Sequence, residues 1–184
     1  MTRLFIAVDL PSGCRKQLAD LRIDIKGARW IDEENIHLTL AFLGEVGDHL
    51  RLDLDEALGE VRASAFAVDL SGVGWFPTRG EPTVFWVGCQ PNEALDRLKR
   101  RVDRALAEVG IRLEKRRFRP HITVARLKHC RSRDLGQIER AHSLFRLSEV
   151  PVSSFSLMSS RLDPEGAVYH RLQRVELGGE STRH

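Results

Sequence analysis

The stretch "NIHLTLAFLG", residues 35–44, places a histidine and a threonine two positions apart in an otherwise apolar run. The stretch "RPHITVARLK", residues 119–128, repeats this arrangement. Because successive side chains of a strand point to opposite faces, His37 and Thr39 share one face of such a strand and the leucines share the other. Each stretch therefore predicts a strand with one core face and one face that carries an imidazole and a hydroxyl group.

The segments around these two strands alternate between strand-like and helix-like patterns. β-branched and aromatic runs predict further strands over residues 3–10, 65–76, 83–89, 150–162 and 167–177. Apolar residues at helical spacing predict helices over residues 14–25, 50–61, 95–109 and 135–144. This order indicates an α+β fold rather than a doubly wound parallel sheet. Each His-x-Thr strand follows a predicted helix in its own half of the chain, which suggests two similar lobes.

The composition limits the classes of protein that this chain can represent. Its 184 residues are 42% hydrophobic and 30% charged, as is typical of a soluble globular domain. No apolar run approaches the roughly 20 residues of a membrane helix, and the amino terminus lacks a secretion signal, so we expect a cytoplasmic protein. Cys14, Cys89 and Cys130 are scattered without a Cys-x-x-Cys pair, which predicts reduced thiols.

Basic residues are concentrated around the second motif. One acid, Glu114, falls in the same stretch, whose nine basic residues are Arg112, Lys115, Arg116, Arg117, Arg119, Arg126, Lys128, Arg131 and Arg133. This density favours an anionic ligand such as phosphate, although the chain is rich in arginine throughout. There is no glycine-rich phosphate loop, which disfavours a nucleoside triphosphatase.

Two His-x-Thr strands that face one cleft would supply the groups needed to cleave a phosphodiester. One imidazole can take a proton from water while the other donates a proton to the departing oxygen. The threonine hydroxyls can bind phosphate oxygens. For either strand alone a structural histidine is the simpler interpretation, but the paired occurrence favours catalysis. A metal site is disfavoured because neither motif carries a carboxylate or a second histidine on the same strand face.

The chain resembles the 2H phosphoesterase superfamily, and within it the bacterial and archaeal RNA 2',3'-cyclic phosphodiesterases once described as 2'-5' RNA ligases. The resemblance covers nearly the whole chain and rests on "RLFIAVDLP", "RWIDEENIHLTLAFLGEV", "FRPHITVARLK" and "FSLMSSRLDPEGAVYHRL". It implies one bilobal domain over residues 1–177, with two antiparallel sheets facing a central cleft and helices on the outside. Residues 178–184 are expected to form a disordered tail.

The resemblance also implies a reaction and a set of roles. A monomer would open the terminal 2',3'-cyclic phosphate of RNA to a 2'-phosphate without metal or cofactor. His37 would be the general acid and His121 the general base, while Thr39 and Thr123 would hold the phosphate oxygens. Arg126 would lie near the phosphate, but strand parity puts it on the core face, so the strand must twist or bulge before it.

Two other functions stay open at this point. The first is a binding module that holds phosphorylated RNA ends or nucleotides without turnover, and the second is a 2'-5' RNA ligase. Phe42, Phe118 and Tyr169 lie near the motifs and are candidates for stacking on a base. Parity puts Phe42 on the core face of its strand, so we expect this side chain to be buried.

Overall fold

A computed structural model describes residues 2–78, 81–114, 116–163 and 166–178 of the chain. Its strands are β1 (Thr2–Val8), β2 (Ala28–Trp30), β3 (Leu38–Val46), β4 (Phe66–Thr78), β5 (Glu81–Cys89), β6 (His121–Leu127), β7 (Arg146–Val152), β8 (Ser154–Asp163) and β9 (Gly166–Glu176). Its helices are α1 (Ser12–Ala19), α2 (Arg51–Gly59), α3 (Glu93–Glu108) and α4 (Ser132–His142), with short 3-10 turns η1 (Glu33–Asn35) and η2 (Asp48–Leu50). The predicted α+β class is confirmed.

The strands form one antiparallel sheet with two halves. Its order is β7-β4-β5-β6-β3-β1-β8-β9, and β2 pairs with β6 beside this path. β6 and β3 meet at the centre through one pair of residues, Leu38 and Ile122. The structure therefore differs from the predicted two separate sheets, because the strands at the border touch once before they diverge.

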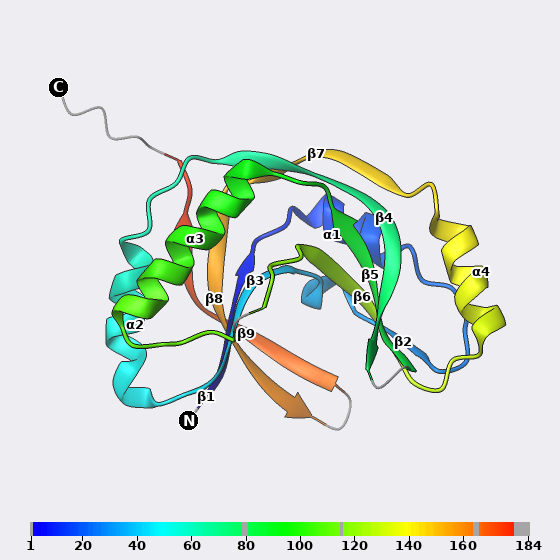
Figure 1. Cartoon of the computed structure of the whole chain (residues 1–184), viewed down its shortest axis with the longest axis horizontal. Helices are drawn as coiled ribbons and strands as arrows, with labels where there is room; N and C mark the ends of the chain where they lie inside the picture. Colours follow the sequence, from blue (N-terminus) through cyan, green and yellow to red (C-terminus); the bar gives the residue numbers. More distant parts are fainter. Residues whose placement is uncertain (1, 79–80, 115, 164–165, 179–184) are drawn as a thin grey trace.

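The helices cover one face of this sheet. α2 and α3 lie side by side over the half that contains β1, β8 and β9, whereas α4 lies against the other half (Figure 1). The strand residues that face the helices are apolar and buried, as Ile6, Leu38 and Ile122 illustrate. The buried side chains form one continuous hydrophobic cluster across both halves. The single domain over residues 1–177 stays a prediction, which this continuous core supports.

α3 is the longest of the described helices. Asn92 precedes it, and the Asn92 side chain accepts a hydrogen bond from the Leu95 N–H at 3.0 Å, which satisfies one of the free donors of the first turn. Leu98, Val102 and Leu106 follow at helical spacing and are fully buried. The predicted helix over residues 95–109 is thus confirmed to within a few residues at its start.

Other boundaries differ from the prediction. The predicted strand over residues 150–162 is two strands, because β7 ends at Val152 and β8 begins at Ser154. These two strands pair with β4 and β1, which lie in different halves of the sheet. β2 was not predicted, since three residues carry too short a pattern. α1 ends at Ala19, so the loop that follows it, rather than the helix, buries Leu21 and Ile25.

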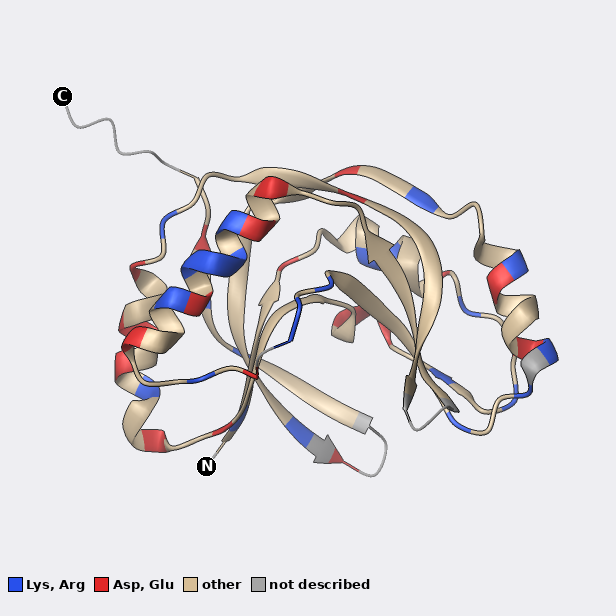
Figure 2. Cartoon of the chain, viewed as in Figure 1, with Lys and Arg blue, Asp and Glu red and all other residues tan. Residues whose placement is uncertain are grey.

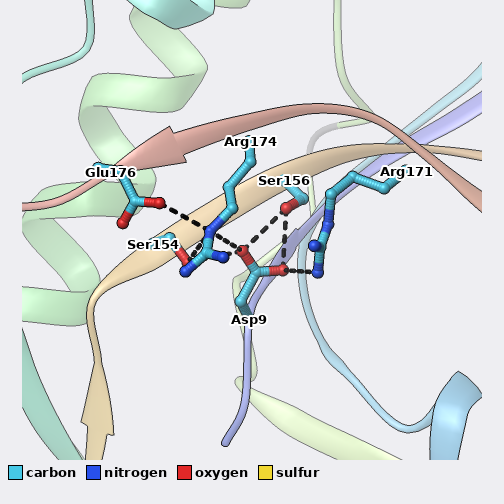
Figure 3. A network of polar contacts seen from close by, with 6 residues as sticks. All are labelled: Asp9, Ser154, Ser156, Arg171, Arg174 and Glu176. Carbon is cyan, nitrogen blue, oxygen red and sulfur yellow. Dashed lines mark hydrogen bonds and ion pairs between the residues drawn. The ribbon is translucent and has the colours of Figure 1, made fainter.

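A polar network fastens β1 to β8 and β9 (Figure 3). The Asp9 carboxylate accepts hydrogen bonds from the hydroxyl groups of Ser154 at 2.6 Å and Ser156 at 2.9 Å, and both serines are fully buried. Arg171 donates to the same carboxylate at 3.2 Å, and Arg174 lies 3.7 Å from it. One carboxylate thus satisfies two buried hydroxyls and two guanidinium groups from neighbouring strands.

The predicted tail, residues 178–184, lies outside the described residues except for Gly178, whose N–H donates to the Ala63 carbonyl at 3.0 Å. Within the described residues, no helix is long and apolar enough to cross a membrane.

We expect Asp9→Ala to lower the free energy of unfolding by about 1–3 kcal/mol, because the Ser154 and Ser156 hydroxyls would be left buried without their acceptor. Urea denaturation followed by circular dichroism measures this change. Glu60→Ala is the control, since the Glu60 side chain forms an exposed ion pair with Arg62 whose loss should change stability little. Equal stabilities of the Asp9 variant and the wild type would contradict the role assigned to the network.

Candidate active site

The contact between β3 and β6 brings the two His-x-Thr motifs together. Leu38 is the residue between His37 and Thr39, and its partner Ile122 is the residue between His121 and Thr123. In an antiparallel register this pairing directs His37 toward Thr123 and Thr39 toward His121. Both apolar residues face the core and are fully buried. The four polar side chains therefore share the opposite face at the border between the two halves of the sheet.

A cleft of about 370 Å³ opens on this face. It contains all five residues that the sequence proposed for the site, together with aromatic, small and basic residues from β1, β8 and β9. Its lining consists of Arg3, Leu4, Phe5, Ile31, Asn35, His37, Thr39, Phe42, Gly44, His121, Thr123, Arg126, Ser160, Ala167 and Tyr169. Both motifs thus line one cleft, and the roles expected of their residues stay predictions.

Each of the two motif strands has a β-bulge directly after its threonine. On β3 the pairing with β1 passes from Thr39 to Ala41, which leaves Leu40 as an extra residue. On β6 the pairing with β5 passes from Thr123 to Ala125, which leaves Val124 as the extra residue. A bulge inserts one residue and so shifts the alternation of side chains beyond it. Both Leu40 and Ala41 are consequently buried, as are their counterparts on β6.

The bulges decide where Arg126 and Phe42 point. Arg126 is exposed and lines the cleft, so the bulge that simple parity required before it is present. Phe42 holds the equivalent position on β3 and also lines the cleft, with 70% of its surface exposed. The prediction that Phe42 is buried was wrong, because the extra residue Leu40 moves Phe42 from the core face to the cleft face. The bulge thus directs an aromatic ring into the cleft from the first motif and a guanidinium from the second.

The two imidazoles are held in the same way. The Nδ1 atom of His37 lies 2.7 Å from the Asn35 carbonyl oxygen, and the Nδ1 atom of His121 lies 2.7 Å from the Arg119 carbonyl oxygen. A carbonyl oxygen can only accept a hydrogen bond, so Nδ1 carries the proton in both rings. The Nε2 atom of each ring is then the nitrogen that gains or loses a proton.

Aromatic side chains surround each imidazole. The His37 ring lies 4.9 Å from the Phe5 ring and 5.4 Å edge-on from the Tyr169 ring, measured between centroids. The His121 ring lies 4.8 Å edge-on from the Phe76 ring. These contacts restrict the rotation of both rings and exclude water from one side of each. They also reduce the solvation of a protonated imidazole.

Burial lowers the pKa of both histidines below the usual value of 6.5. For His37, desolvation is the largest cause, and the positive charges of Arg126 and His121 lower the pKa further. The carbonyl groups of Asn35 and Arg119 act in the opposite direction, because they accept a hydrogen bond from the charged ring. The effect of the His121 charge on the pKa of His37 indicates that the two imidazoles are electrostatically coupled.

The basic stretch around the second motif does not form one continuous binding surface. Arg126 is its only member that lines the cleft among the described residues. Arg116 pairs with Glu114 at 2.8 Å, while Arg131 pairs with Asp134 at 2.9 Å. Figure 2 shows basic residues along the loop that enters β6, whereas acidic and basic residues alternate on α3. Lys115 lies outside the described residues.

The sequence and the structure of the chain match one known family. The family model described as the 2'-5' RNA ligase superfamily matches residues 10–164. This chain belongs to the 2'-5' RNA ligase superfamily. The resemblance seen in the two motifs is confirmed, and the motifs lie inside the matched region.

Relatives in this superfamily share almost the whole chain. An RNA 2',3'-cyclic phosphodiesterase of Archaeoglobus fulgidus is 35% identical over 95% of this chain and 99% of its own length. A protein of the same name from Thermotoga maritima is 34% identical over 99% of each chain. The crystal structure of E. coli LigT in its apo form matches with a TM-score of 0.78 and 29% identity, and covers 97% of this chain and 98% of LigT. The predicted class of enzyme is the class named in these full-length relatives.

Residues outside the two motifs complete the cleft of this superfamily member. Arg3 and Phe5 come from β1, and Ser160 comes from β8. Sequence reasoning did not select them, because a strand pattern reveals which residues share a face but not which strands lie beside each other. Tyr169 was named as a candidate for base stacking, and the structure places it in the cleft. Phe118 was named as well, but it does not line the cleft.

The Cys, Asp and Glu residues that the structure describes do not line this cleft. Within the ranges that the structure describes, no group of three or more His, Cys, Asp or Glu side chains could hold a metal ion. Cys14, Cys89 and Cys130 are free cysteines. Burial raises the pKa of the Cys14 and Cys89 thiols to about 11, so both remain protonated and unreactive at neutral pH.

We expect NMR titration of the imidazole resonances to give pKa values below 6.5 for both His37 and His121. In Arg126→Ala the pKa of His37 should rise, because a positive charge that disfavours the protonated ring has been removed. Arg161→Ala is the control, because it removes the same charge from an exposed residue that does not line the cleft and should leave the pKa of His37 unchanged. A pKa of His37 that stays the same or falls in Arg126→Ala would contradict the electrostatic coupling.

Proposed function

We propose that this chain hydrolyses the terminal 2',3'-cyclic phosphate of RNA to a 2'-phosphate, using the two histidines and no metal ion. The observation that carries the proposal is the matched pair of imidazoles. Each donates Nδ1–H to the carbonyl two residues before it, which leaves two titratable Nε2 atoms in one cleft. The activity named in the full-length relatives agrees with this chemistry.

In the proposed reaction one Nε2 atom acts as the base and the other as the acid. His121 takes a proton from water at Nε2 while the water oxygen attacks phosphorus. The bond between phosphorus and the 3'-oxygen breaks, and His37 gives its Nε2 proton to that oxygen. The products are a 2'-phosphate and a 3'-hydroxyl, and solvent returns both rings to their starting states. His37 and His121 approach from different halves of the sheet, which suits an in-line displacement.

The other residues of the site stabilise charge. Thr39 and Thr123 can donate hydroxyl hydrogen bonds to the non-bridging oxygens of the phosphate. Arg126 lines the same cleft without an ion pair in the described residues, so its guanidinium is available to the charge that develops on these oxygens. A bound phosphate anion also counters the positive charges that lower the pKa of His37, and therefore favours the protonated ring that the general acid requires.

A nucleotide-bound relative supports the choice of substrate class. E. coli LigT has a crystal structure in complex with 3'-AMP. This structure matches with a TM-score of 0.76 and 28% identity, and it covers 97% of the present chain and 99% of LigT. A pure binding module would need the threonines and the arginine but would not need two imidazoles with matching hydrogen bonds. We therefore favour hydrolysis as the function over binding without turnover.

We expect His37→Ala and His121→Ala each to lower turnover of a nucleoside 2',3'-cyclic phosphate in EDTA by roughly 10²–10⁴-fold, the usual contribution of one proton-transfer group. Steady-state kinetics measures the loss, and circular dichroism confirms folding. His170→Ala is the matched control, because this histidine is exposed on β9 and does not line the cleft. Full activity of a folded His37 or His121 variant would remove that residue from the mechanism.

The individual roles can be separated with a substrate analogue that has a better leaving group at the 3' position. Such a group needs little protonation, so it should restore much of the activity lost in His37→Ala but little of that lost in His121→Ala. Phosphorus NMR of the product of the natural substrate should show a 2'-phosphate. Rescue of His121→Ala alone would exchange the two roles, and a predominantly 3'-phosphate product would contradict the proposed orientation of the cyclic phosphate.

A further inference from the structure

The cleft extends along β1 beyond the residues assigned to the phosphate. Arg3, Leu4 and Phe5 of β1 line the cleft, and the residues of β1 pair with those of the neighbouring strands in rows across the sheet. Ala7 pairs with Thr39, and Phe5 pairs with Phe42. Arg3, at the far end, pairs with Ser160 of β8. At the usual rise of a strand, Arg3 lies about 13 Å along β1 from the row that contains the motif threonine.

The Arg3 guanidinium is not used by the fold. Within the described residues it makes no hydrogen bond or ion pair, although it lines the cleft. Arg171 and Arg174, on the same half of the sheet, differ in that Asp9 pairs with both of them. Glu45 is the cross-strand partner of Arg3, but the two side chains form no ion pair. Arg3 is therefore a second free cation in the cleft, in addition to Arg126.

The two free arginines lie in different parts of the cleft. Arg126 belongs to the second motif on β6, whereas Arg3 belongs to the opposite half of the sheet, where β1, β8 and β9 run side by side (Figure 1). Phe42 lines the cleft in the row between the motif threonine and Arg3. Tyr169 pairs with Ser160 and so belongs to the Arg3 row, and its ring lies 5.4 Å from the His37 ring. The cleft thus presents two unpaired arginines from different halves of the sheet, with the aromatic residues Phe42 and Tyr169 in the same lining.

We propose that Arg3, assisted by the Ser160 hydroxyl, binds the phosphodiester on the 5' side of the terminal nucleotide, so that the cleft has a subsite for an RNA chain as well as for its cyclic phosphate end. This inference rests on the proposed function for the identity of the terminal group. A guanidinium binds a phosphate through two parallel N–H donors, and the neighbouring hydroxyl adds a third donor. Oligonucleotides should consequently bind more tightly than their mononucleotide ends alone.

Binding of two dinucleotides that end in a 2'-phosphate tests this subsite without requiring turnover. One carries the natural phosphodiester and the other a neutral methylphosphonate linkage. By isothermal titration calorimetry we expect the wild type to prefer the charged linkage by about five- to tenfold, a value discounted for the exposure of Arg3. Arg3→Ala should reduce the preference to about twofold or less. The slope of log K against log salt for the charged dinucleotide should fall by about 0.7 in this variant.

Two further variants complete the test. Arg161→Ala removes the same charge from the next residue after Ser160, on the opposite face of β8 where Arg161 pairs with Asp163, and should keep the wild-type preference. Glu45→Gln removes the negative charge opposite Arg3 and should increase the preference. Equal binding of the two dinucleotides by the wild type, an unchanged preference in Arg3→Ala, or a reduced preference in Glu45→Gln would overturn the subsite.

The failure of this inference can be distinguished from the failure of the proposed function. If the linkage preference depends on Arg3 but the wild type does not hydrolyse a nucleoside 2',3'-cyclic phosphate, the subsite stands and the proposed reaction is wrong. If the wild type hydrolyses the cyclic phosphate but binds both dinucleotides equally, the reaction stands and the subsite is wrong.

Discussion

The single pairing between Leu38 of β3 and Ile122 of β6 is the constraint on which the site depends. It joins the two halves of the sheet at the residue between histidine and threonine in each motif. Because the two apolar side chains are buried on the helix-covered face, the polar neighbours of both must share the other face. A one-residue slip in either strand would bury the imidazoles and expose the core. The energy of the hydrophobic core therefore fixes the register of the site.

The two halves repeat a backbone design but differ in the chemistry that they present. Each motif has a histidine held through Nδ1, a cleft-facing threonine and a bulge after it. Beyond the bulge, one motif presents Phe42 and the other presents Arg126. The positive charge of Arg126 then acts on His37, whose pKa it lowers. This difference gives two similar imidazoles different electrostatic surroundings, as a reaction with separate acid and base requires.

The sequence predicted the fold class, the two motif strands and four of the five site residues from pattern alone, since side-chain parity is a local property. It was wrong about Phe42 because an apolar residue at core parity gives no sign of a bulge, which depends on the register with β1. Arg126 was found only through the family resemblance, for the same reason. Arg3 was missed because its place in the cleft depends on strands β3 and β8, which are distant from it in the sequence.

The most direct test of paired histidines in one cleft is the pH dependence of kcat/KM for a nucleoside 2',3'-cyclic phosphate, measured in EDTA. If one imidazole must be neutral and the other protonated, the profile has an acidic and a basic limb. These limbs report the pKa values of the acid and the base in the free enzyme. Because burial lowers the pKa of both His37 and His121, the maximum should lie below about pH 6.5. A profile that rises to a plateau with only one limb would contradict the shared chemistry of the two motifs.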